Sequence, residues 1–126
     1  MWKGFDMEQI SGSAEGLEEK MKKATCEMLA LFLFKDNEMY VNEVAEELAR
    51  RSGGVFAISF PYAVIYRMER HGYVQLKDKH IAKDGRLRQF YKITDKGRAY
   101  LAELLASYGR MEKGISAILH SDGSKE

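Results

Sequence analysis

The spacing of apolar residues changes along this 126-residue chain, and the change limits the folds that the chain can adopt. From Glu15 to Gly72 the apolar residues recur at three- and four-residue steps, the period of a helix buried on one side. From Tyr73 to Ile93 they alternate with polar residues in two short runs, the period of a β-strand. After Thr94 the helical period returns. We therefore expect a mainly α-helical domain with one small β-hairpin.

The first two helices are expected over Glu15–Phe34 and Asn42–Arg51, with Asn42 as the N-cap of the second and Gly53 close to its end. The single Cys26 lies in the first helix and is expected to be a buried, reduced thiol. Three- and four-residue steps predict one strongly buried side for this helix, made by Leu17, Met21, Ala24, Met28, Leu31 and Phe32.

A third helix is expected to begin near Pro61, because proline is tolerated in a first turn, and to end at Gly72. Ser59 is the expected N-cap. The inward residues are expected to be Val64, Ile65 and Met68. The outer side then carries Tyr62, Tyr66 and Arg70 at four-residue spacing, flanked by Ala63 and Arg67.

The hairpin is expected to pair Tyr73–Lys77 with Arg88–Ile93. The tip between these strands has Asp84 and Gly85 as its turn residues. Residues 62–100, which include the hairpin, hold ten Lys and Arg against four Asp and Glu, a local charge of +6 in a chain of net charge +1. Such a surface suits a polyphosphate ligand, and a solvated lysine-rich surface is the alternative.

The last helix is expected to span some twenty-five residues from its N-cap, Thr94. It is too long for the domain to cover, so a second copy of the same helix is the expected partner, with folding back on the first helix as the alternative. Its apolar stripe has heptad spacing and consists of Leu101, Leu104, Leu105, Tyr108, Met111, Ile115 and Ile118.

Other classes of protein find little support. The three histidines are not spaced as metal ligands with Cys26 or a carboxylate, and no glycine-rich phosphate loop joins a strand to a helix. We therefore expect no enzyme activity, no metal and no cofactor. The N-terminus has no signal peptide pattern and no apolar run is long enough to cross a membrane, so a cytoplasmic protein is expected.

Two segments resemble the PadR family of bacterial transcriptional regulators, which have a winged helix-turn-helix fold. They read Tyr62-Ala-Val-Ile-Tyr-Arg-Met-Glu-Arg-His-Gly-Tyr73 and Gly85-Arg-Leu-Arg-Gln-Phe-Tyr-Lys-Ile-Thr-Asp-Lys-Gly-Arg98. The start of the third helix, Ser59-Phe60-Pro61-Tyr62-Ala63, departs from the family, which usually has Thr-Leu before the tyrosine and proline after it. The residues that match the family pattern are Tyr62, Gly72, Gly85, Arg86, Arg88, Tyr91, Thr94 and Gly97.

The resemblance implies four segments: an N-terminal arm (1–14), a winged helix-turn-helix DNA-binding domain (15–94), a C-terminal dimerisation helix (95–120) and a tail (121–126). It implies a homodimer on a pseudo-palindromic operator, with half-sites ~34–36 Å apart on double-stranded DNA. The recognition-helix candidates are Ser59, Tyr62, Ala63, Tyr66, Arg67 and Arg70. The wing candidates are Lys79, His80, Lys83, Arg86 and Arg88, of which Arg88 faces either DNA or an acidic neighbour.

The resemblance also implies repression that a small aromatic or cationic effector relieves. Aromatic residues of the arm and of the first and last helices are the candidates for its pocket, with plain core packing as the alternative: Trp2, Phe5, Phe32, Phe34, Tyr100 and Tyr108. Winged helices also serve protein–protein association without specific DNA binding, and that is the alternative function. A basic hairpin and a basic, aromatic third helix favour DNA.

Overall fold

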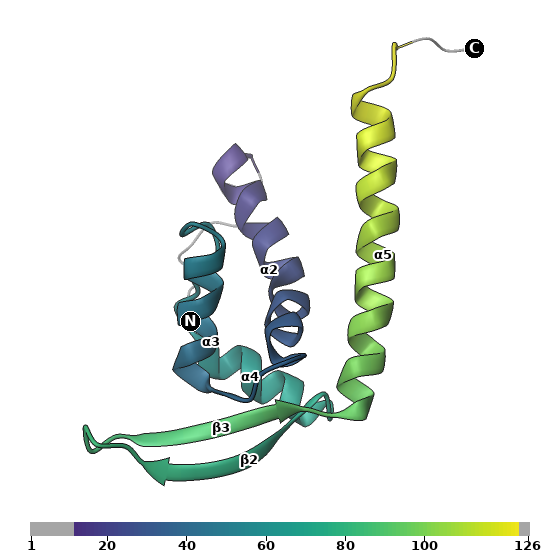
Figure 1. Cartoon of the computed structure of the whole chain (residues 1–126). Helices are drawn as coiled ribbons and strands as arrows, with labels where there is room; N and C mark the ends of the chain where they lie inside the picture. The colour runs from purple at the N-terminus through teal and green to yellow at the C-terminus, as the bar shows by residue number, and fades with distance from the viewer. Residues whose placement is uncertain (1–11, 124–126) are drawn as a thin grey trace.

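The chain folds into a mainly helical domain with a small sheet, as the computed structural model shows for residues 12–123 (Figure 1). The helices are α2 (Ala14–Phe34), α3 (Val41–Arg51), α4 (Pro61–Arg70) and α5 (Asp95–Leu119). The strands are β1 (Met39–Tyr40), β2 (Val74–Ile81) and β3 (Leu87–Ile93). The winged helix-turn-helix fold with a long last helix is thereby confirmed. Most of the expected arm and the end of the expected tail lie outside the described residues.

Two helices begin at caps other than the predicted ones. Tyr40 is the N-cap of α3, and its backbone N–H donates to a carboxylate oxygen of Glu43 at 3.2 Å, so the prediction of Asn42 was wrong. Tyr40 is held extended by β1, which makes the helix begin directly after it. Phe60 rather than Ser59 precedes α4, because Pro61 at the first helical position keeps the residue before it out of the helical conformation.

The sheet is antiparallel in the order β1-β3-β2, so β3 is its central strand. The hairpin is longer than predicted, since β2 continues to Ile81 and the tip comprises only residues 82–86. The backbone ladder continues there without core contacts, because strand pairing satisfies backbone donors and acceptors even between exposed residues. Gly85, at φ +83°, supplies the left-handed residue of the turn, as predicted.

The core lies where the second half of α2, α3 and α4 meet β3. Its largest fully buried side chains include Tyr91, Phe34, Leu31, Ile65 and Met68. Cys26 is buried, as predicted. The predicted buried side of α2 was largely wrong: of its six residues only Met28 and Leu31 are buried, whereas Leu17, Met21, Ala24 and Phe32 are exposed.

The reason lies in how far α2 reaches. Apart from Gly16, its buried residues all fall between Cys26 and Phe34, because only that half packs on the rest of the domain. Of the apolar residues in the first half, Met21 and Ala24 instead line the space between α2 and α5. A helical period in the sequence therefore identified the apolar residues of this helix but not which neighbour covers them.

The helix α5 leaves the sheet through a tight joint. Thr94 is its N-cap, as predicted: the Gly97 backbone N–H donates to Oγ1 of Thr94 at 2.9 Å. The same hydroxyl donates to the carbonyl of Gly72 at 2.6 Å, which ties the start of α5 to the end of α4. The ring of Tyr73 stacks on that of Tyr100, with centroids 4.0 Å apart. These contacts fix the direction in which α5 departs.

Beyond this joint α5 runs beside α2 and extends past the end of that helix (Figure 1). Leu101 is buried and Leu104 packs partly on the core. The rest of the stripe is exposed, namely Leu105, Tyr108, Met111, Ile115 and Ile118, with exposed fractions from 40% to 72%. Folding back on α2 thus covers only the first turns of the stripe.

No helix in residues 12–123 is long and apolar enough to cross a membrane. Nor does this part of the chain bring together three or more His, Cys, Asp or Glu side chains as metal ligands.

We predict that Gly97→Ala destabilises the fold by about 1–3 kcal/mol, because a Cβ at this position would overlap the Tyr73 carbonyl oxygen and the Ile93 side chain. Gly109→Ala is the matched control, since a Cβ there meets nothing within 4 Å and alanine favours a helix interior by about 1 kcal/mol. Thermal denaturation followed by circular dichroism measures both. Equal melting temperatures for the two variants would contradict the close packing at the joint.

Candidate nucleic-acid interface

The outer side of α4 carries a mixed aromatic and basic surface. Ile65 and Met68 are fully buried, which turns the opposite side of the helix to solvent. On it the Tyr62 and Tyr66 rings meet edge to face with centroids 5.7 Å apart, and each side chain is 38% exposed. The remaining predicted residues of this helix, Ala63, Arg67 and Arg70, are exposed as well. Ser59 is exposed in the loop before the helix.

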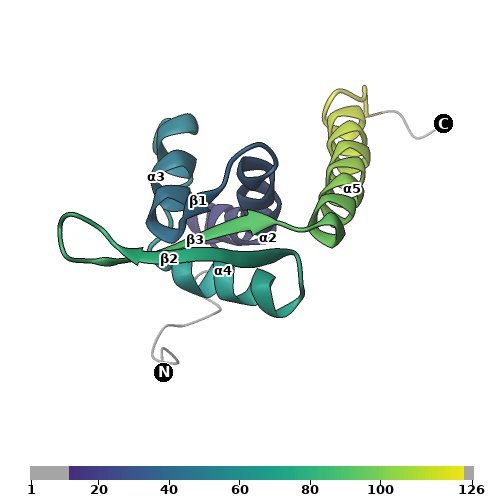
Figure 2. The same ribbon diagram turned by 60° about the horizontal axis from the view of Figure 1, so that its bottom comes forward.

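Side-chain hydrogen bonds join this helix to the hairpin. The Tyr66 hydroxyl donates to Oε1 of Gln89 at 3.0 Å, and the Tyr91 hydroxyl donates to Oε1 of Glu69 at 3.3 Å. Burial, together with the charge of Glu69, raises the pKa of Tyr91, so its hydroxyl keeps its proton. Figure 2 shows α4 lying along the hairpin. The helix and the hairpin therefore form one surface with a defined relative position.

Arg67 points toward α2 and forms an ion pair with Glu27 there. The Arg67 side chain is 44% exposed and that of Glu27 is 23% exposed, so the pair lies at the edge of the core. Glu27 therefore partly neutralises Arg67, which the sequence analysis predicted to contact DNA. No signal in the sequence pointed to this pair, because its members are forty positions apart and on helices whose relative rotation depends on packing.

The remaining cations divide into paired and unpaired groups. Lys77 bonds to Glu38 at 2.7 Å, and Arg88 bonds to Asp84 at 3.1 Å while lying over the Tyr40 ring at 4.2 Å. Of the two alternatives for Arg88, the structure thus has the acidic neighbour. Five cations on α4 and the hairpin make no ion pair within the described residues: Arg70, Lys79, Lys83, Arg86 and, in β3, Lys92.

The predicted wing residues also divide between the two faces of the hairpin. His80 is paired with Arg88 in the ladder, and the His80 ring stacks on Phe90 at 5.2 Å, on the face turned away from α4. Lys79 is paired with Gln89, which bonds to Tyr66, so Lys79 shares the face toward α4. Among the predicted wing residues that lie in the strands, Lys79 is thus the one on the hairpin face that continues the outer surface of α4.

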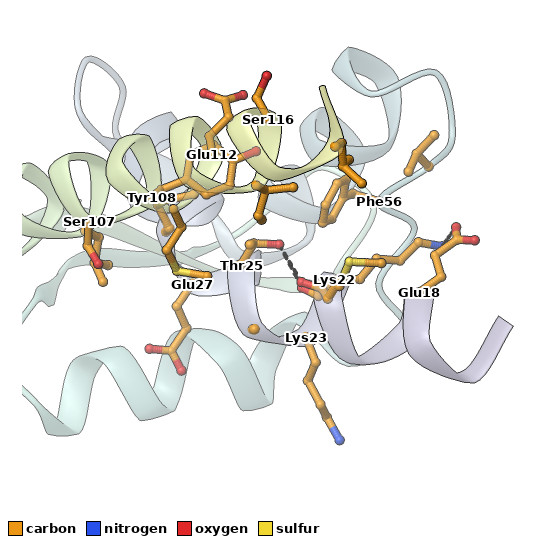
Figure 3. Close-up of a pocket in the computed structure, with 18 of the residues that line it drawn as sticks. Glu18, Lys22, Lys23, Thr25, Glu27, Phe56, Ser107, Tyr108, Glu112 and Ser116 are labelled. Carbon is orange, nitrogen blue, oxygen red and sulfur yellow. Dashed lines mark hydrogen bonds and ion pairs between the residues drawn. The ribbon is translucent and has the colours of Figure 1, made fainter. Parts of the chain in front are cut away.

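A second feature is an apolar groove of about 1000 Å³ between α2 and α5 (Figure 3). Its lining includes Met21, Met28, Phe56, Tyr100, Leu104 and Tyr108. Glu27 also borders this groove, but Figure 3 shows its carboxylate pointing away from α5. The groove therefore has apolar walls from both helices.

The aromatic pocket expected from the sequence is found only in part. Tyr100 and Tyr108 line the groove, whereas Phe34 is a core residue at 2% exposure and Phe32 packs under Lys35. Phe56, from the loop after α3, lines the groove and was not predicted. The other two candidates, Trp2 and Phe5, lie outside the described residues.

Comparison with known proteins gives consistent matches. The family model of PadR-like transcriptional regulators matches residues 29–103. A Lysinibacillus sphaericus protein named "Uncharacterized protein X" is 31% identical over 94 residues, which cover 73% of this chain and 84% of that protein.

Solved structures agree in fold. The crystal structure of a PadR-like transcriptional regulator from Bacillus cereus is 25% identical with a TM-score of 0.69, covering 82% of this chain and 99% of that one. Bacillus subtilis PadR, solved in complex with operator DNA, has a TM-score of 0.58 at 16% identity and covers 64% of this chain and 47% of that one.

We predict that Glu27→Gln makes the protein elute from immobilised heparin at higher salt, because Arg67 loses its charged partner and becomes available to a polyanion. The control is Glu46→Gln on α3, which removes the same charge without releasing an arginine, since Glu46 forms no ion pair in the part of the chain that the structure describes. A shift of equal size in both variants would mean that net charge alone governs retention.

Proposed function

Because the chain belongs to the PadR-like family of transcriptional regulators, we propose that it binds a specific operator in double-stranded DNA. The observation that carries this proposal is the continuous surface of α4 and the hairpin, on which Arg70, Lys79, Lys83 and Arg86 have no acidic partner among the described residues. Unpaired cations suit contact with the DNA phosphates, and the exposed aromatic rings beside them suit contact with the bases between the two backbones. The operator complex of Bacillus subtilis PadR supports the proposal through its shared fold.

The residues of this surface divide into two roles. The helix α4 enters the major groove, where Tyr62, Ala63 and Arg70 reach base edges or the neighbouring phosphates. Lys79, Lys83 and Arg86 contact the flanking backbone and raise affinity through counterion release. Tyr66 positions Gln89 through its hydroxyl and contributes its ring to the helix surface.

The DNA-binding unit in this proposal is residues 15–94, and residues 95–120 form the dimerisation helix. The exposed stripe of α5 and the apolar groove beside it are two halves of one surface that a second copy covers. A two-fold dimer would place two α4 helices on successive major grooves, which requires a pseudo-palindromic operator.

Repression that a ligand relieves is the regulatory mode that we propose. The groove is part of the proposed dimer surface, and its aromatic residues Phe56, Tyr100 and Tyr108 suit a planar apolar or cationic molecule held between the two copies. Binding at this place would change the angle between the two DNA-binding units. A regulator of chromosomal DNA acts in the bacterial cytoplasm.

The experiment that tests the proposal is fluorescence anisotropy with the DNA upstream of the protein's own gene and a scrambled duplex of equal length. Tighter binding to the upstream DNA that persists near physiological salt is expected from a sequence-reading protein. Absence of binding to both duplexes at low salt would contradict the proposal and favour the alternative, association with a protein partner.

We predict that Arg70→Ala weakens operator binding by about 1–3 kcal/mol without unfolding the protein, because the side chain is exposed and makes no ion pair in residues 12–123. Arg110→Ala removes the same charge from the distal part of α5 and serves as the matched control. Anisotropy titrations measure both affinities. If Arg70→Ala and Arg110→Ala bind the operator equally well, α4 is not the reading element.

We predict that Leu104→Glu with Met111→Glu converts a dimer into a monomer, because two carboxylates would enter the apolar groove surface. Ala102→Glu with Ala106→Glu adds the same two charges at exposed positions of α5 outside the stripe and is expected to remain dimeric. Light scattering gives the masses. An unchanged mass for the first variant would place the interface elsewhere.

A further inference from the structure

Two large apolar side chains stand at the tip of the hairpin, far from the groove and the core. Ile81 is 71% exposed and Leu87 is 53% exposed, and they are partners in the last residue pair before the turn. This pair is the last of the β2–β3 ladder, and the end of the hairpin reaches beyond the helices (Figure 1). Apolar side chains in an exposed pair at a loop tip are costly in water, which suggests a surface that becomes covered.

The register of the hairpin decides which way this pair faces. A bulge between Leu76 and Asp78 shifts the alternation of β2, so that Lys79 and Ile81 rather than His80 share a face with Leu76. Leu87 lies two residues before Gln89 and four before Tyr91, both of which bond to α4. Ile81 and Leu87 therefore face the same side as α4.

Position along the hairpin adds a second constraint. Tyr91 contacts Glu69 in the last turn of α4, and Gln89 contacts Tyr66 one turn earlier, so α4 runs with its N-terminus toward the hairpin tip. Leu87 is the next residue on this face, beyond Gln89. The apolar pair thus extends the surface of Tyr62 and Tyr66, and one ligand can contact all of it.

The charges around the pair identify that ligand. Lys79, Lys83 and Arg86 surround the tip and are exposed. Two acids lie among them: Asp84 is occupied by Arg88 and by the backbone N–H of Arg86, and Asp78 lies 3.6 Å from His80. An apolar pair inside a ring of cations matches a duplex groove, which has sugar edges inside and phosphates along its rims.

We propose that Ile81 and Leu87 form an apolar wedge that enters the minor groove beside the segment read by α4 and deforms the DNA there. The inference rests on the proposed DNA-binding function. Opposed side chains of a strand pair lie ~5 Å apart at Cβ, and the minor groove of B-DNA is ~6 Å wide, so the pair must widen the groove to enter it. Apolar side chains of this kind unstack a base step and kink the duplex.

The wedge has a consequence for sequence preference. Pyrimidine–purine steps unstack at lower cost than stiff A-tracts, so the operator flanks matter even though no hydrogen bond reads them. The protein would then recognise bases through α4 and the deformability of the flanking DNA through the hairpin tip.

The test uses the full chain with Ile81→Thr and Leu87→Thr, since threonine retains strand propensity and removes most of the apolar surface. Affinity for the operator is measured by anisotropy at several salt concentrations, and DNA bending by energy transfer between dyes at the duplex ends. We expect about tenfold weaker binding at every salt concentration, an unchanged salt slope and less bending. Replacing a flanking TA step with an A-tract should weaken the wild type but not the variant.

The comparison variant carries Lys79→Gln, Lys83→Gln and Arg86→Gln. It should lower the salt slope by about three, because each lost phosphate contact removes about 0.9 from it. The two variants thus separate the apolar contribution from the ionic one.

Several results would overturn the wedge. One is that the threonine variant binds and bends the operator as strongly as the wild type does. Another is that the salt slope of this variant differs from that of the wild type. The third is a changed mass of this variant by light scattering, which would assign the tip to self-association. Each of these leaves operator binding by the wild type intact. Failure of the wild type to bind any duplex overturns the proposed function itself, and the wedge with it.

Discussion

The burial of Tyr91 between the sheet and α4 is the constraint on which the interface depends. Tyr91 lies in the central strand β3 at 1% exposure, and its hydroxyl reaches Glu69 of α4. A buried hydroxyl must keep a hydrogen-bond partner, so the helix cannot slide or rotate along the strand without losing one. The Tyr66–Gln89 bond one turn away holds the same alignment. Helix and hairpin therefore present their outer residues as one surface.

This alignment determines which cations are available to a polyanion. Positive charge is abundant in residues 62–100, yet Arg67, Lys77 and Arg88 have acidic partners on α2, before β1 and in the turn. Charge in the sequence therefore overstates the charge that the surface offers. Of the cations without such partners in the described residues, Arg70 lies on the outer side of α4 and Lys79, Lys83 and Arg86 lie around the hairpin tip, beside exposed aromatic and apolar side chains. Recognition by the proposed surface thus combines ionic contacts with packing.

The groove and the interface meet at one residue. Glu27 borders the groove between α2 and α5 and pairs with Arg67 on α4. Burial, and after it the nearby Tyr73 and Glu27, raise the pKa of the Tyr100 hydroxyl on α5. An occupant of the groove and a ligand of α4 therefore lie on opposite sides of a single side chain.

The sequence by itself determined the features that local chemistry controls: the four helices and the hairpin in their order, the start of α4 at Pro61, the Gly85 turn and the Thr94 cap, but not the short strand β1. These depend on residues within one turn of each other. Tertiary structure alone decided the exposed first half of α2, the partner of Arg67 and the face of Ile81. Each depends on packing between distant segments or on one bulge that reverses the alternation of a strand, and no local pattern encodes either.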